Sequence, residues 1–147
     1  MKTIISIIFV GLSFLSSYGQ DLKLSIIQNS DEPDTAKEHF YLVKVTNTSR
    51  KATLFSVSAF NAKCSNEKSI ETDFTQEILN NNKSLGDKEH TIKPNESMEV
   101  FVKLTKPKNS KLNSWNCTQV NAISKNGDVI SNTVSIESFI PDPKDFN

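Results

Sequence analysis

The sequence predicts an all-β protein built as a single antiparallel β-sandwich of about seven short strands. Apolar and polar residues alternate with a period of two along most of the chain, and a helical period is nearly absent. This alternation is typical of strands with one buried and one solvent-facing side, as antiparallel sheets have. The alternating segments are residues 22–26, 41–46, 55–59, 98–104, 118–122 and 130–136.

Polar turns separate the predicted strands and support the same fold class. Asn126-Gly127 is a strong hairpin signal, because both residues accept the positive φ angles of a tight turn. The segment 73–80 departs from the strand pattern, and there we expect one or two helical turns. The residues expected to face inward from these turns are Phe74, Ile78 and Leu79.

The N-terminal segment has the order of a secretory signal peptide. Lys2 gives a positive start, an apolar run follows at 4–15, and small residues precede Gln20 at the positions that a signal peptidase reads. The run is shorter than the ~20 residues of a membrane-spanning helix, and the alternative is a buried core helix. We expect the mature protein to be exported, either periplasmic or secreted to the cell surface, with no transmembrane segment. The expected divisions are a signal peptide at 1–19, the sandwich domain at 20–140 and a short tail at 141–147.

The charge of the chain is balanced. It has 17 basic and 17 acidic residues, and Lys2 is the single charged residue of the predicted signal peptide. A nearly neutral mature chain has no strong positive field to hold polyanions. This balance argues against nucleic acid as a partner.

Three stretches resemble bacterial immunoglobulin-like domains. Residues 43–49, followed by 52–57, resemble strands B and C of cell-adhesion-related (CARDB-type) domains, and 92–97 is similar to the approach to their strand E. Residues 120–127 resemble strand F and the F–G turn of fibronectin type III domains. The resemblance covers most of 21–139, and it implies an immunoglobulin-like sandwich without naming a function.

The chain has two cysteines, Cys64 and Cys117, and an even pair in an exported protein usually forms a disulfide. The alternative is two free thiols. In the fold that the resemblance implies, strands C and F are antiparallel neighbours. Alternation from Phe55 and from Thr118 then directs both cysteines outward, which predicts a cross-strand disulfide on the outer face unless a bulge intervenes.

No residue cluster in the sequence points to catalysis, a cofactor or a metal. His39 and His90 are the two histidines, and neither has an acid or cysteine at metal-ligand spacing. We therefore expect both to be solvated at the surface. An acidic group at 31–34 could hold calcium weakly, but turn chemistry explains it equally well. We expect that the protein is not an enzyme and needs no cofactor.

Strand parity directs three aromatic side chains outward, namely Phe60, Phe101 and Trp115. Exposed aromatic rings can stack on a sugar or pack against a partner protein, so this outer face is the candidate binding surface. The alternative is that Trp115 covers the sandwich end or the disulfide.

Short modification motifs also occur. Asp34-Thr35-Ala36 resembles an O-glycosylation motif of one group of Gram-negative bacteria, which makes Thr35 a candidate acceptor. Asn47, Asn95 and Asn116 begin N-glycosylation patterns, which asparagine-rich chains also produce by chance.

Together these features predict an exported, non-catalytic module that binds a protein or glycan partner at the cell envelope, through loops, an outer face or an open sheet edge. The alternative is an inhibitor or a small periplasmic enzyme on the same β-sandwich fold.

Overall fold

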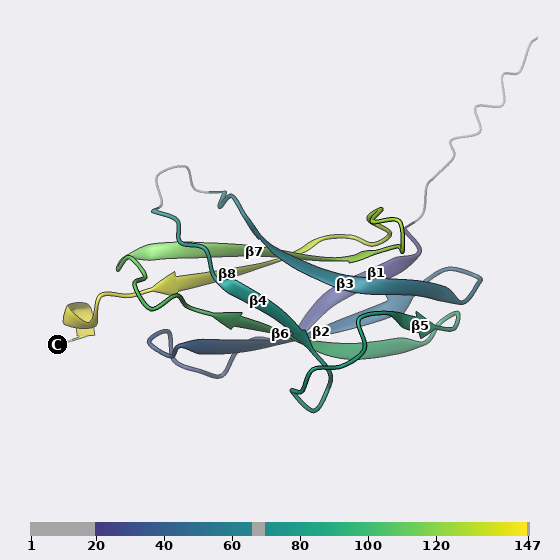
Figure 1. Ribbon diagram of the computed structural model, residues 1–147, viewed down its shortest axis with the longest axis horizontal. Coiled ribbons are helices and arrows are strands. Elements are labelled where there is room, and N and C mark those ends of the chain that lie inside the picture. The colour runs from purple at the N-terminus through teal and green to yellow at the C-terminus, as the bar shows by residue number, and fades with distance from the viewer. Residues whose placement is uncertain (1–19, 66–69, 147) are drawn as a thin grey trace, which may run out of the picture.

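Eight strands and one short 3-10 helix make up the computed structural model in the residues it describes, 20–65 and 70–146 (Figure 1). The predicted signal peptide at 1–19 lies outside these ranges. The strands are β1 (Leu22–Gln28), β2 (Glu38–Asn47), β3 (Thr53–Ala62), β4 (Thr75–Leu79), β5 (His90–Ile92), β6 (Ser97–Thr105), β7 (Ser114–Ile123) and β8 (Val134–Ile140), and the 3-10 helix is η1 (Pro143–Phe146).

The strands form two antiparallel four-stranded sheets that pack face to face (Figure 1). The first sheet has the order β1-β2-β6-β4 and the second has the order β5-β3-β7-β8. From β2 to β7, consecutive strands alternate between the first and the second sheet. A sandwich of two antiparallel sheets connected in this way is immunoglobulin-like, which confirms the predicted fold class. Within the described ranges, no helix is long and apolar enough to cross a membrane.

The core lies between the sheets and follows the predicted alternation. Inward-facing residues of both sheets are almost completely buried, and each large aliphatic or aromatic side chain contributes about 1.5–3 kcal/mol to folding by leaving water. Its fully or nearly fully buried members include Leu22, Leu24, Val43, Val45, Phe55, Val100, Val102, Leu104, Val120, Ala122 and Ile136.

The prediction of helical turns at 73–80 is wrong, because this segment contains strand β4. A spacing of four residues fits both a helix and a strand, so Phe74 and Ile78 share the inward face in either case. Leu79 instead lies opposite Phe101 of β6 and shares its outward face, where a turn brings Leu85 back beside it. Leu79 is buried by this turn rather than by the main core.

Two left-handed backbone positions shape the connections. Gly127 has a φ of 86° in the turn between β7 and β8, where the sequence predicts a hairpin. Asn95 has a φ of 62°, donates its backbone N–H to the Asn47 carbonyl at 2.9 Å, and forms a bulge just before β6. Asparagine tolerates this conformation better than most residues, and the bulge sets the register of β6 against β2.

Candidate functional site

Trp115 lies near the start of β7 on the outward face of the second sheet. The residue is 37% exposed, and its ring centroid lies 4.9 Å from that of Phe139, its cross-strand partner on β8. Such a tilted contact is typical of stable aromatic pairs. Trp115 is therefore a surface residue that Phe139 supports on one side and that is partly open to solvent.

A disulfide joins Cys64 and Cys117 two residues further along β7. Their Cα atoms are 5.3 Å apart, and Cys64 follows the end of β3, where Ala62 pairs with Cys117. Glu71 accepts a 2.9 Å hydrogen bond from the Cys64 backbone N–H. The disulfide therefore ties the chain just after β3 to β7, the strand that carries Trp115.

The backbone of Trp115 is held on both sides. On one side it pairs with Phe139 of β8. On the other, its N–H donates to the Ile70 carbonyl at 2.8 Å, and its carbonyl accepts from the Thr72 N–H at 2.9 Å. The segment 70–72 thus takes the place of β3 beside this part of β7, which fixes the position of the indole.

Phe60 shares this outward face. It is 41% exposed on β3 and pairs with Gln119, four residues along β7 from Trp115. The disulfide lies between the two aromatic positions. We call the outward-facing group formed by Phe60, Trp115, Phe139 and the Cys64–Cys117 disulfide the Trp115 surface.

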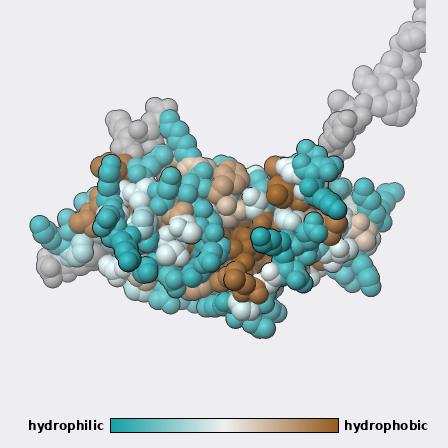
Figure 2. All heavy atoms as spheres, viewed as in Figure 1, coloured by the Kyte–Doolittle hydropathy of each residue, from teal (hydrophilic) through white to brown (hydrophobic). Residues whose placement is uncertain are grey.

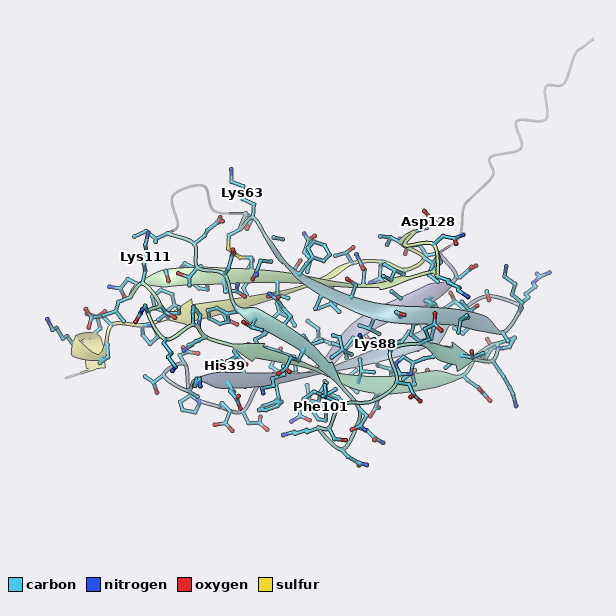
Figure 3. The ribbon with its side chains drawn as sticks, in the orientation of Figure 1. His39, Lys63, Lys88, Phe101, Lys111 and Asp128 are labelled. Atoms are coloured by element: carbon cyan, nitrogen blue, oxygen red, sulfur yellow. A yellow bond between two sulfur atoms is a disulfide. The ribbon has the colours of Figure 1, made fainter. Side chains whose placement is uncertain are left out.

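Phe101 does not belong to the Trp115 surface, so the prediction of one face for all three aromatics is wrong. Phe101 lies on β6, in the other sheet, and its outward direction points to the opposite side of the molecule. Figure 3 shows Phe101 on the lower side and Lys63, the neighbour of Cys64, on the upper side. The Lys83 ammonium lies 5.1 Å from the Phe101 ring centroid and 4.7 Å from that of Phe40. Parity predicts that a side chain points outward, but it does not identify the sheet.

His39 is 3% exposed, so the prediction of a solvated surface histidine is wrong. β2 begins at Glu38, and its alternation places His39 on the same inward side as Tyr41. Burial and, to a lesser degree, the positive charge of Lys106 lower the pKa of His39. Burial also lowers the pKa of Lys106, whose ammonium donates to the Asp34 backbone carbonyl. His39 is therefore part of the packing at one end of the sandwich.

The second histidine, His90, is partly buried. Its ring lies 5.7 Å from that of Phe55, between centroids, at the start of β5. In the described ranges, no group of three histidine, cysteine, aspartate or glutamate side chains is arranged to hold a metal ion.

The candidate modification sites differ in accessibility. Thr35 is exposed in the loop between β1 and β2, so its assignment as an acceptor stays a prediction. Asn47 and Asn116 are buried, and their amide groups donate to other parts of the chain. Sequence reasoning missed this structural role, which the inward parity of Asn47 with Val45 could have indicated.

Neither family models nor curated proteins match the chain. Among solved structures, a FixG-related protein from Vibrio parahaemolyticus is similar, with a TM-score of 0.51 and 18% identity over 82% of this chain and 96% of that chain. A conjugative transposon lipoprotein from Bacteroides eggerthii has a TM-score of 0.43 and 7% identity over 80% and 96% of the two chains. A PapD-like domain of human CEP192 has a TM-score of 0.44 and 6% identity over 95% and 99%. The likeness to the FixG-related protein concerns the fold, which agrees with the sandwich described above.

Proposed function

We propose that the chain is an exported, non-catalytic binding module of the cell envelope, and that a protein or glycan partner binds at the Trp115 surface. The observation that carries this proposal is an indole that is partly open to solvent and yet fixed in place. Phe139 supports its ring, and β8 and residues 70–72 hold its backbone. A ring fixed before binding loses little conformational freedom when it stacks on a partner.

The second aromatic position widens the surface on which a partner can rest. Phe60 and Trp115 are exposed on adjacent strands of one sheet, and between these two positions the disulfide joins β7 to the chain just after β3. Aromatic anchors on a rigid support are the usual centres of binding energy in interfaces. This arrangement suits a flat ligand such as a sugar ring or an apolar side chain of a protein.

The positions of the residues with shifted pKa values favour binding over catalysis. Among the described residues, His39, Tyr41 and Lys106 have pKa values shifted by burial, and all three belong to the first sheet or the strand end beside it. They support packing there and do not border the Trp115 surface. A catalytic group must lie within hydrogen-bond reach of a bound substrate, and these three groups lie away from the surface where we propose that the partner binds.

Export is supported by the predicted signal peptide and by the disulfide, since structural disulfides persist in oxidising compartments. The exposed face of such a module would be in contact with envelope proteins and glycans. This environment is where we place the partner.

Arrays of oligosaccharides and of envelope-protein peptides, probed with labelled mature protein, test the proposal. Trp115→Ala should weaken the strongest signals at least fivefold, which corresponds to about 1 kcal/mol. Val129→Ala is the matched control, because Val129 is an exposed apolar residue in the turn at the other end of β7. Equal binding by wild type and Trp115→Ala would contradict the proposal, as would equal losses in the two variants.

A further inference from the structure

Strand β6 has an unpaired edge at its N-terminal half. β2 pairs with β6 along its whole length, from Ser97 to Thr105. β4 covers the opposite edge from Thr105 only to Phe101, which pairs with Leu79. Within the ranges 20–65 and 70–146, no strand lies on that side of residues 97–100.

The backbone groups of Ser97 and Glu99 point toward this open side. At the bulge before β6, the Asn47 N–H donates to the Glu96 carbonyl at 2.9 Å. Alternate residues of an antiparallel strand bond to the same neighbour, so Ser97 and Glu99 direct their N–H and C=O groups away from β2. Phe101, the next residue of β6 with this orientation, directs its backbone groups to β4 in the same way.

A hollow of about 820 Å³ lies along the same edge. Its apolar lining comes from several elements, and the apolar side chains gather in the middle of the face seen in Figure 2, around the end of β4. Ile78 and Met98 face inward at this edge and are partly buried against the core, whereas Leu85 lines the outer side of the hollow beside Leu79 and is 79% exposed. The edge therefore combines unpaired backbone groups with a recess that has apolar side chains inside a polar rim, and these are the two features by which a sheet edge recognises a strand.

We propose that this edge binds an extended peptide segment of a partner protein, which adds to β6 as an antiparallel strand in line with β4. Ser97 and Glu99 would provide about four backbone hydrogen bonds. Side chains on one side of the added strand, at every second position, would fill the recess at Ile78 and Met98. This proposal names a surface on the first sheet, apart from the Trp115 surface of the second sheet.

The chemistry of the edge also indicates which peptide fits. Asp87 and Glu99 contribute two negative charges to the rim of the hollow, and Lys44 contributes one positive charge. The favoured segment alternates aliphatic residues, which face the recess, with polar or basic residues, which face the rim. A second copy of this chain fits less well, because pairing two four-residue edges buries much less than the ~1,000 Å² that a specific interface needs.

Nuclear magnetic resonance with the mature protein tests this edge. The probe is a short acetylated and amidated peptide of alternating valine and lysine, and the matched probe has the same sequence with alternate backbone nitrogens methylated. The first peptide should slow hydrogen exchange of the Ser97 and Glu99 amides, and the methylated peptide should have no effect. Equal effects of both peptides, or changes confined to β8 or β3, would overturn the proposal. No binding at millimolar peptide would also overturn it.

Two variants separate this edge from other sites. Leu85→Lys should lower the affinity for the peptide at least tenfold. The fold should be retained, because the Leu85 side chain is exposed. Val129→Lys is the matched control, and it should leave the affinity unchanged. Trp115→Ala should also leave it unchanged, so failure of this proposal is distinguishable from failure of the Trp115 surface. Without peptide, hydrogen exchange of the Ser97 amide that becomes slower as the protein concentration rises would show that two copies of the chain pair at this edge. That result would overturn the proposal that a partner's peptide is the occupant.

Discussion

Asn116 donates a 2.7 Å hydrogen bond from its side-chain amide to the side-chain oxygen of Asn61. The same Asn116 amide donates to the Thr72 carbonyl at 3.0 Å, and Gln76 donates to Asn61 at 2.7 Å. These contacts join β3, β7, β4 and the segment that leads into β4. They lie inside the sandwich, behind the strand end that carries Trp115.

Replacing Asn116 should therefore destabilise the fold. Asn116→Leu removes both amide hydrogens and leaves the partly buried Thr72 carbonyl and part of the Asn61 oxygen without partners, a change that costs about 2 kcal/mol. Urea unfolding followed by circular dichroism measures the loss. Asn109→Ala, at an exposed loop position, should change the free energy of unfolding by less than about 0.5 kcal/mol. A similarly small effect of Asn116→Leu would show that water replaces the amide.

The sequence was sufficient to predict most strands and the core because a strand buried on one side repeats its apolar residues at every second position. Val100, Val102 and Leu104 lie in the core as this pattern predicts. The same period could not assign Phe101 to a sheet, since sheet membership depends on pairing with distant segments. Nor could it separate helix from strand for Phe74 and Ile78, whose spacing fits both.

The buried polar residues were the harder part of the candidate site. Asn116 begins a glycosylation pattern, and the sequence around it does not reveal that its amide meets the Asn61 side-chain oxygen and the Thr72 carbonyl. The burial of His39 was not predicted, because the predicted strand began at Tyr41, two residues after His39. In both cases the burial comes from segments that are far away in the sequence.

The two cysteines should be oxidised in the exported protein. Thiol labelling of the denatured, unreduced protein should modify neither Cys64 nor Cys117. A double Cys64→Ser, Cys117→Ser variant should lose up to about 4 kcal/mol of stability, because the bond closes a loop with a sequence separation of 53 residues. Hydrogen exchange should also become faster at Thr72, whose N–H bonds to Trp115. Quantitative labelling of both thiols would contradict the prediction.

The mature chain should begin at Gln20. Mass spectrometry of protein taken from the periplasm or the medium should show an N-terminal residue derived from Gln20, as the small residues before it predict. Tyr18→Lys is not expected to alter this site, whereas Gly19→Lys should block cleavage, because the peptidase reads small residues at alternate positions. An intact Met1 on exported protein would contradict the assignment of 1–19.

Stability should fall as the pH is lowered through the range in which histidine titrates. The pKa of His39 is lowered from its usual value near 6.5, mainly by burial and then by Lys106, although the Ala36 carbonyl, Asp34 and Glu32 act in the opposite direction. Below pH ~6.5 the unfolded chain binds a proton at this position that the folded chain does not bind, so protons favour unfolding. The free energy of unfolding should therefore decrease from pH 7.5 to 5.5, with a slope of at most ~1.4 kcal/mol per pH unit from this residue.

Two variants isolate the contribution of His39. His39→Phe keeps an aromatic ring in the buried position and removes the titrating group, so the slope between pH 7.5 and 5.5 should become shallower. If this ring destabilises the fold, His39→Gln provides the same comparison with a neutral polar side chain. Val129→Ala controls for a substitution elsewhere, because Val129 is exposed and does not titrate, and the wild-type slope should persist in it. An unchanged slope in both His39 variants would contradict the prediction, because the pH dependence would then come from other groups.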